Sequence, residues 1–382
     1  MRRLSVLLAV TLLITLLPCP GQAAQIETGR KSALLMDAAT GTILYESNAH
    51  EPLAPASVTK VMTMLLIMEA LDSGKINWDD RVTTSEAAAA KGGSQVYLKV
   101  GETMTVTDML KSIAVSSAND CACAMAEHLC GSEGAFVEAM NARAKEPGME
   151  DTNFVNCTGL DDSEEARNHR TSAHDIAVMS RQLLKNHPDI KKFTTIWMDS
   201  VRDGAFGLSN TNKLIRFYDG ATGLKTGFTS GAGYCLSASA LREGMELIAV
   251  VMGAESSQVR FQSCKAMLDH GFANYALIQP DLCDAGEVPV VLGKAPSVRP
   301  RMGETAQMLI DKAQKSTVTT DIQLEESLTA PVSQGQRLGT LRVKSGEQIL
   351  KEIPLVAAEG VERLTYGDIF LHVLRRAAMA SC

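Results

Sequence analysis

The chain has 382 residues, enough for two domains, and its 45% hydrophobic and 21% charged residues are typical of a folded protein. Its formal net charge of −7 gives no support for nucleic-acid binding, which favours a basic surface. No collagen-like, heptad or solenoid repeat is present, so fibrous and repeat architectures are excluded.

Residues 1–23 have the pattern of a secretory signal peptide. Two arginines precede an apolar run, Leu4 to Leu17, and small residues up to Ala23 follow it. The run is short for a membrane span. Lipidation at Cys19 is the weaker alternative, because Pro18 fits that cleavage pattern poorly. We therefore expect an exported protein, at the outer face of the cytoplasmic membrane, in the cell wall or in the periplasm.

The mature chain begins with a predicted hairpin and a predicted helix. Two strand-like runs, Ala33 to Met36 and Thr42 to Tyr45, flank a turn. In the helix that follows, Pro55 suits the first turn and Gly74 suits the left-handed position past the end. Apolar residues occupy almost every face from Val58 to Leu71, which indicates a helix that is buried on all sides.

Ser57 and Lys60 stand at the start of this helix. They are three residues apart, so they share one face of its first turn. A serine hydroxyl is a weak nucleophile until a base takes its proton, and a lysine that is held neutral can be that base. About one Ser-x-x-Lys is expected by chance in a chain of this length. The pair therefore indicates catalysis only if other motifs support it.

A tight polar turn, Ser117-Ala118-Asn119, joins two further predicted helices. It lies between the apolar runs Met109–Val115 and Cys121–Leu129. Serine and asparagine are ordinary helix caps. The turn nevertheless offers a hydroxyl and an amide that could meet a substrate and a neighbouring amine.

The nine cysteines do not indicate a metal site. Cys121, Cys123 and Cys130 lie close together beside His128, but zinc sites usually pair two such clusters or use a Cys-x-x-Cys knuckle. The other histidines show no His-Glu-x-x-His pattern. We predict buried cysteines that act as small hydrophobic residues, with no metal and no cofactor.

The sequence of residues 172–252 predicts a helix and another hairpin. The helix starts at Ser172, a cap, and is stopped by Pro188. The apolar runs Tyr234–Leu241 and Met245–Met252 flank a turn and predict two strands. Lys225-Thr226-Gly227 leads into this hairpin, and its glycine would let a substrate lie close against the strand. An amphipathic helix is predicted to follow.

Three short patterns occur in the order of the motifs of penicillin-recognising serine enzymes: Ser57-x-x-Lys60, Ser117-x-Asn119 and Lys225-Thr226-Gly227. Lys344-Ser345-Gly346 matches a looser form of the third motif, but a hairpin turn explains it better. From Ser32 to Tyr275 the chain resembles the low-molecular-mass penicillin-binding proteins, the D-alanyl-D-alanine carboxypeptidases.

The resemblance implies an α+β protein. Residues 24–276 would form a β-lactamase/transpeptidase-like catalytic domain, an antiparallel sheet flanked by helices. Residues 277–360 would form a small β-rich, sandwich-like domain, and residues 361–382 an amphipathic helix on the membrane surface. Leucines, a phenylalanine, a valine and an alanine approximate one apolar face of that helix: Leu364, Phe370, Val373, Leu374 and Ala377.

The resemblance also implies a reaction, removal of the last D-alanine from a peptidoglycan stem pentapeptide ending in D-Ala-D-Ala, a step of peptidoglycan biosynthesis that bears on cell shape. Ser57 would attack the carbonyl between the two D-alanines, with Lys60 as the base. Lys225 and Asn119 would hold Lys60 in place, and the charge of Lys225 would help to lower its pKa. β-Lactam antibiotics would acylate Ser57.

Five other residues would complete the site. Ser117 would relay a proton to the leaving amine, and the backbone N–H groups of Ser57 and Phe228 would form the oxyanion hole. Thr226 and Arg260 would recognise the terminal carboxylate, because a guanidinium can donate two hydrogen bonds to it. Gly227 would let the substrate approach the strand.

Two alternatives belong to other classes of protein. A serine β-lactamase shares the motifs, and Glu164 and Glu165 lie where such enzymes carry a deacylating acid, but the Glu-x-x-Leu-Asn arrangement is missing. The extra β domain also argues against it. A catalytically dead cell-wall-binding protein would have lost Ser57 or Lys60. One departure from many carboxypeptidases is Gly231, where they carry an acidic residue.

Overall fold

The computed structural model describes residues 29–282, 285–304 and 306–371. The predicted signal peptide, residues 1–23, and residues 372–382 of the predicted terminal helix lie outside the described residues. The chain divides into two compact units, Met1–Gly271 and Phe272–Cys382.

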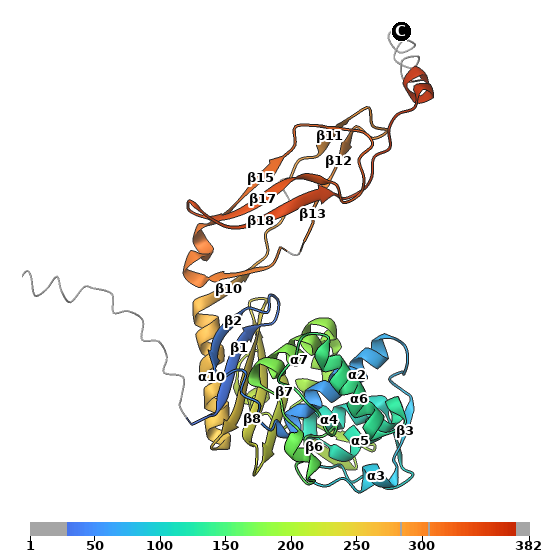
Figure 1. The fold of residues 1–382 in the computed structure, drawn as a ribbon, viewed down its shortest axis with the longest axis vertical. Coiled ribbons are helices and arrows are strands. Elements are labelled where there is room, and N and C mark those ends of the chain that lie inside the picture. The colour runs from blue at the N-terminus through green and yellow to red at the C-terminus, as the bar shows by residue number, and fades with distance from the viewer. Residues whose placement is uncertain (1–28, 283–284, 305, 372–382) are drawn as a thin grey trace, which may run out of the picture. The chain divides into compact units, whose positions relative to one another are not determined.

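The first unit is built on a five-stranded antiparallel sheet with the strand order β2-β1-β9-β8-β7 (Figure 1). Its strands are β1 (Ser32–Asp37), β2 (Ile43–Ser47), β7 (Ala221–Thr229), β8 (Gly233–Arg242) and β9 (Met245–Ala254). Helix α10 (Ser257–Asn274) covers one face and the other helices of the unit lie on the opposite side (Figure 1). Strand β7 is at an edge of this sheet, so only one of its sides pairs with another strand of the sheet.

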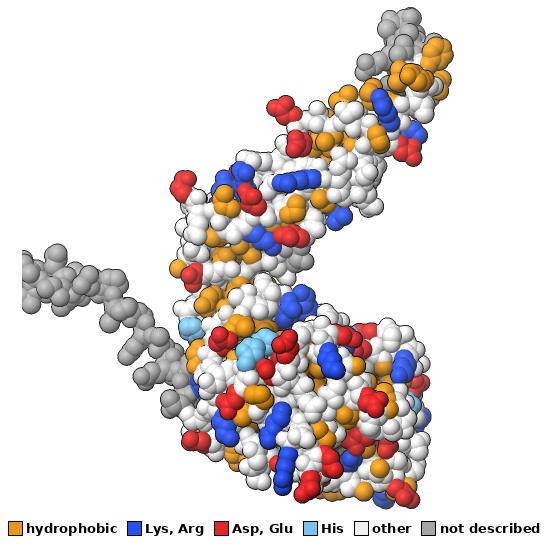
Figure 2. All heavy atoms as spheres, viewed as in Figure 1, with side chains coloured by type: hydrophobic (Ala, Val, Ile, Leu, Met, Phe, Trp, Pro, Cys, Tyr) orange, Lys and Arg blue, Asp and Glu red, His pale blue; other side chains and the backbone are white. Residues whose placement is uncertain are grey.

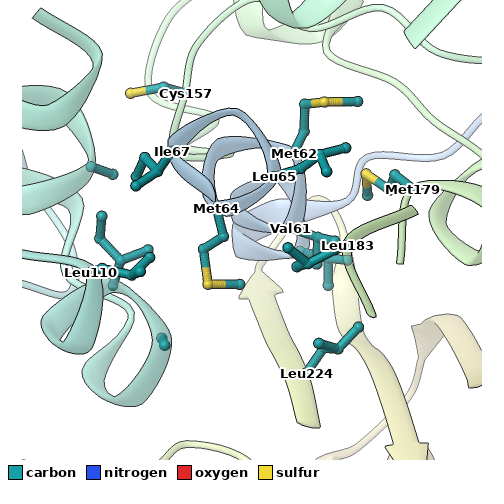
Figure 3. Close-up of a cluster of buried hydrophobic side chains, with 14 of the residues drawn as sticks. Val61, Met62, Met64, Leu65, Ile67, Leu110, Cys157, Met179, Leu183 and Leu224 are labelled. Carbon is teal, nitrogen blue, oxygen red and sulfur yellow. The ribbon is translucent and has the colours of Figure 1, made fainter. Parts of the chain in front are cut away.

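The helix that follows Ser57 fills the centre of the helical part. A 3₁₀ turn, η1 (Ala56–Thr59), precedes α2 (Lys60–Asp72), so the α-helix begins later than the sequence predicted. Gly74 has the expected positive φ, +70°. The apolar side chains of α2 point outward in several directions and meet α4 (Val106–Ser116), α7 (Ala173–Asn186) and β7 (Figure 3). The burial of these side chains confirms the expectation of a helix that is buried on all sides. Each of them stabilises the fold by about 1.5–3 kcal/mol.

The remaining elements of this unit are helices, 3₁₀ turns and short strands. The helices are α3 (Glu86–Ala89), α4 (Val106–Ser116), α5 (Asn119–Cys130), α6 (Glu133–Lys145), α7 (Ala173–Asn186), α8 (Lys191–Thr194) and α9 (Leu214–Phe217), with 3₁₀ turns η2 (Glu165–Asn168) and η3 (Pro188–Ile190). Strand β3 (Arg81–Thr83) pairs with β4 (Thr103–Thr105), and β5 (Met198–Val201) pairs with β6 (Phe206–Ser209), in two small antiparallel sheets. The cap at Ser172 is confirmed, because its side chain accepts a hydrogen bond from the Asp175 N–H. On the face shown in Figure 2, acidic and basic side chains are interspersed over this unit.

The second unit is rich in strands. A four-stranded antiparallel sheet has the order β13-β18-β17-β15, and a three-stranded sheet has the order β12-β11-β16. Strand β10 pairs with β14. The elements are β10 (Tyr275–Ile278), β11 (Val288–Val291), β12 (Ser297–Val298), β13 (Pro300–Met302), β14 (Met308–Asp311), η4 (Lys312–Thr317), β15 (Val318–Leu324), β16 (Leu328–Thr329), β17 (Arg337–Ser345) and β18 (Gln348–Ala357). Lys344-Ser345-Gly346 lies at the hairpin between β17 and β18, as predicted.

Candidate active site

The Ser57 hydroxyl and the Lys60 amine are in contact. Lys60 Nζ donates to Ser57 Oγ at 3.0 Å and to the carbonyl oxygen of Thr158 at 2.9 Å. The predicted placement of both side chains on one face of the first turn is therefore confirmed. Thr158 was not anticipated, because a backbone carbonyl leaves no sequence motif; the following Gly159 was the one available sign of a tight approach.

Burial makes Lys60 a base. The side chain is fully buried, and burial lowers its pKa from 10.5 to about 7, while the charges of Cys157 and Asp120 oppose that shift. We expected Lys225 to help lower this pKa. Instead, it is the pKa of Lys225 that is lowered, mainly by the burial of Lys225 and further by the repulsion from Lys60.

The backbone just before the nucleophile is strained. Ala56 has φ +48°, a value that non-glycine residues rarely adopt. The Thr59 hydroxyl donates to the Ala56 carbonyl at 2.8 Å and lies 2.8 Å from His169 Nε2. Val155 N–H donates to His169 Nδ1 at 3.1 Å, so Nδ1 is the acceptor and Nε2 carries the proton that is donated to Thr59. Burial lowers the pKa of His169 to about 4 and keeps the ring neutral.

Two glycines let other segments approach this strained turn. A Cβ on Gly159 would lie 1.8 Å from the Ala56 carbonyl oxygen. A Cβ on Gly227 would lie 2.6 Å from the Pro55 carbonyl oxygen and 3.1 Å from Ser57 N. We expected Gly227 to make room for a substrate, but it is the nucleophile segment itself that lies against β7 here. The next residue along β7, Phe228, keeps 54% of its surface exposed and its ring lies 4.3 Å from that of Tyr234.

Ser117 and Asn119 lie in the turn between α4 and α5. Ser117 ends α4 with φ +64°. Asn119 donates from Nδ2 to the Gly92 carbonyl at 2.7 Å and from its backbone N–H to the Ser94 carbonyl at 2.7 Å. Its Oδ1 is buried without a hydrogen-bond partner among the described residues. Contrary to our expectation, neither Asn119 nor Lys225 hydrogen-bonds to Lys60, since Lys225 Nζ donates to the Thr226 carbonyl at 3.0 Å.

The third motif is tied to the same turn from β7. The hydroxyl of Thr226 donates to Thr211 Oγ1 at 2.6 Å, and Thr211 N–H donates to the Val115 carbonyl at 3.2 Å. Val115 is two residues from Ser117. The structure thus brings the end of α4 and the β7 edge together through Thr211, which no motif indicated.

Arg260 lies against β7 and β8 rather than in solvent. Its Nη1 donates to the carbonyl oxygens of Gly227 at 2.9 Å and Cys235 at 3.2 Å, and only 8% of the residue is exposed. Its guanidinium carbon lies 5.4 Å from the ring centroid of Tyr234 and 4.8 Å from that of Phe261. A positive charge is therefore fixed directly behind the Lys-Thr-Gly segment.

The cysteines of the helical part are free, and all but Cys130 are buried. Cys121 and Cys123 are fully buried, as expected of small hydrophobic residues, and Cys130 is partly buried. In the part of the chain that the structure describes, no group of three or more histidine, cysteine, aspartate or glutamate side chains could hold a metal ion.

Comparison with known proteins gives the same picture for both units. Residues 20–256 match the model of the peptidase S11 family, described as D-alanyl-D-alanine carboxypeptidase, and residues 282–363 match that of the penicillin-binding protein 5 C-terminal domain. The D-alanyl-D-alanine carboxypeptidase DacF of Bacillus subtilis is 43% identical over 95% of this chain and 95% of its own. The D-alanyl-D-alanine carboxypeptidase DacC of Escherichia coli is 34% identical over 86% of this chain and 83% of its own.

A solved structure of penicillin binding protein 5 from Haemophilus influenzae is similar with a TM-score of 0.74 and 30% identity, covering 88% of this chain and 98% of that chain. The predicted fold class, a transpeptidase-like α+β domain followed by a β-rich domain, is confirmed.

Proposed function

Because the chain belongs to the peptidase S11 family and is a serine-type D-alanyl-D-alanine carboxypeptidase, we propose that Ser57 is the residue that attacks the bond between the two terminal D-alanines. Attack joins Ser57 Oγ to the penultimate D-alanine as an ester and releases the last D-alanine, and water then hydrolyses the ester. The observation that carries this proposal is the 3.0 Å contact between Ser57 Oγ and the amine of Lys60.

Lys60 acts as the general base. With a pKa of about 7, a large share of the amine is neutral at neutral pH and has a lone pair for the Ser57 proton. The Thr158 carbonyl accepts one of the N–H groups, which orients the lone pair. Lys225 is a second amine in the same buried region, and the repulsion between the two amines adds to burial in lowering its own pKa.

The backbone N–H groups of Ser57 and Phe228 stabilise the oxyanion. Gly227 supports this assignment, because its missing side chain lets β7 lie against the Ser57 backbone and so places the next N–H of the strand near the nucleophile. The strained φ of Ala56, held by the Thr59 hydroxyl, sets the direction of the Ser57 N–H.

Ser117 and Asn119 serve the peptide itself. The buried Oδ1 of Asn119 lacks a partner among the described residues, so an amide N–H of the substrate would satisfy it. Ser117 passes a proton to the leaving amine from the neighbouring turn. Both roles require the turn to stay fixed, which the contacts of Asn119 with the 92–94 segment provide.

Thr226 and Arg260 recognise the terminal carboxylate. The Thr226 hydroxyl lies on the Lys-Thr-Gly segment, and Arg260 holds its charge behind the same segment through Gly227. Arg260 Nη1 already donates to two backbone carbonyls. We therefore assign to Arg260 an electrostatic role, in which its positive charge attracts the substrate carboxylate that the Thr226 hydroxyl binds. This pair makes the enzyme an exopeptidase, because only a free C-terminus carries the carboxylate.

Mass spectrometry of the intact protein tests the assignment of the nucleophile. Incubation with penicillin should add the antibiotic's mass to Ser57, and a short acyl-D-Ala-D-Ala peptide should release D-alanine. Ser57→Ala should lose both reactions. Ser73→Ala, at the exposed far end of the same helix, should keep both. An adduct on another residue would refute the proposal, and rapid lactam turnover with free enzyme recovered would identify a β-lactamase instead.

We also propose that the enzyme is exported and held at the outer face of the cytoplasmic membrane by its C-terminal helix. Residues 366–371 are helical and carry exposed apolar side chains, with Tyr366 94% and Phe370 65% exposed. Val373, Leu374 and Ala377 of the predicted apolar face lie outside the described residues. Within the described ranges, no helix is both long and apolar enough to cross a membrane.

A further inference from the structure

The carboxylate of Glu133 joins two segments that border the active site. Glu133 is the first residue of α6, where the N-terminal end of a helix stabilises a negative charge. Its Oε1 accepts the backbone N–H of Cys157 at 3.2 Å and the thiol of the same residue at 3.2 Å. Its Oε2 accepts from Lys91 Nζ at 2.5 Å. The tertiary fold has built this group, because the three residues come from separate parts of the chain.

Glu133 and Lys91 are both charged at neutral pH. Burial opposes both charges, but hydrogen bonds from Lys91 and Cys157 hold the pKa of Glu133 below its usual value. The hydrogen bond to Glu133 likewise holds the pKa of Lys91 above its usual value. The two side chains are only 22% and 23% exposed, so water competes for them less than at an open surface.

The contact with Cys157 fixes the peptide that orients Lys60. The Cys157 carbonyl accepts from Thr63 Oγ1 at 2.7 Å, and the next carbonyl, that of Thr158, accepts from Lys60 Nζ at 2.9 Å. A cavity of about 300 Å³ adjoins this segment, so side-chain packing does not enclose it on that side. Hydrogen bonds therefore hold the segment, and loss of the one to Glu133 would let the Thr158 carbonyl move away from Lys60.

The contact with Lys91 fixes the segment that holds Asn119. Lys91 directly precedes Gly92, whose carbonyl accepts from Asn119 Nδ2 at 2.7 Å. A Cβ on Gly93 would lie 2.8 Å from the same nitrogen, so the segment lies close against the amide. The ion pair with Glu133 holds this segment at its start.

We propose that Glu133 is a positioning residue for the reaction: through Cys157 it holds the Thr158 carbonyl on Lys60, and through Lys91 it holds the segment that orients Asn119. The inference rests on the proposed functions of Lys60 and Asn119. The two contacts have different requirements. The Cys157 N–H needs only a hydrogen-bond acceptor, whereas the Lys91 ammonium needs a negative charge.

Two double variants separate these contacts. Lys91→Met, Glu133→Gln and Lys91→Met, Glu133→Ala both remove the ion pair without a change of net charge, but only glutamine keeps an oxygen for the Cys157 N–H. For the glutamine variant we expect KM for an acyl-D-Ala-D-Ala peptide to rise roughly 3- to 10-fold, because Asn119 is held less firmly. The pH at which acylation by penicillin is half-maximal should stay at that of the wild type.

The alanine variant should lose more. Its rate of acylation by penicillin should fall roughly 10- to 100-fold below that of the glutamine variant, because a small displacement of a catalytic group has an effect of this size. Its half-maximal pH should fall below the wild-type value of about 7, because the ammonium form of Lys60 loses an acceptor. The other titratable groups beside the two active-site amines, Asp120, Cys157 and Arg260, are the same in all variants.

Glu138→Gln is the matched control, since it removes an exposed carboxylate from the same helix, and it should behave as the wild type in every assay. Circular dichroism shows whether each variant is folded. Equal rates and equal half-maximal pH in the two folded double variants would overturn the link through Cys157. An unchanged KM in the glutamine variant would overturn the link through Lys91, whether or not the alanine variant folds. Failure of penicillin to acylate Ser57 in the wild type would instead overturn the proposed function.

Discussion

Replacement of Lys60 by arginine is the sharpest test of the mechanism. Burial lowers the pKa of Lys60 from 10.5 to about 7, so the neutral fraction at pH 7 is roughly a thousandfold or more above that of an ordinary lysine. A guanidinium stays protonated at any accessible pH and cannot take the Ser57 proton. Loss of a general base costs about 10²- to 10⁴-fold in rate, and we expect a loss of this size in Lys60→Arg.

The assay is the second-order rate of acylation by a fluorescent penicillin between pH 5.5 and 9. For the wild type the rate should rise with pH and level off above about 7, because the amine is the reactive base only after it loses its proton. Lys75→Arg is the control, since that exposed lysine donates to the Leu129 carbonyl at the far end of α2. A rate that does not change with pH, or an unchanged rate in Lys60→Arg, would remove Lys60 from the role of base.

Three further results are expected. Arg260→Ala should lower kcat/KM for a peptide with a free carboxylate by roughly 10- to 100-fold. Amidation of the peptide's C-terminus should lower kcat/KM more for the wild type than for the variant. Equal losses of kcat/KM in the two enzymes would show that Arg260 does not recognise the carboxylate. The free energy of unfolding should fall by about 3 kcal/mol as the pH drops from 6.5 to 4, because unfolding releases His169 from a site that holds its pKa at about 4, and His169→Gln should flatten that decline. Removal of the residues after Glu362 should abolish association with anionic vesicles, and retention of binding would disprove the membrane-surface helix.

The local parts of the site could be predicted from the sequence because local spacing determines them. Three residues along a helix place Ser57 and Lys60 on one face whatever the rest of the fold does. The turn at Ser117 was equally visible, since it separates two apolar runs.

The long-range parts could not be predicted in this way. Thr158 lies 98 residues from Lys60 and acts through its backbone, and His169 lies 110 residues from Thr59. Only the tertiary fold brings these groups together. The orientation of Arg260 toward the strand carbonyls is of the same kind, since its position at the start of a helix is also typical of a surface arginine.

The two buried amines have a consequence for folding energetics. Lys60 and Lys225 must lose their hydration when the catalytic unit folds, and their pKa values fall as a result, so the folded state binds fewer protons than the unfolded chain above pH 7. The contribution of Lys60 to stability therefore increases by about 1.4 kcal/mol per pH unit from near 7 toward 10.5. At neutral pH the buried amine of Lys60 therefore makes the core less stable, although catalysis needs it. Lys60→Met should raise the thermal stability of the protein and abolish its activity.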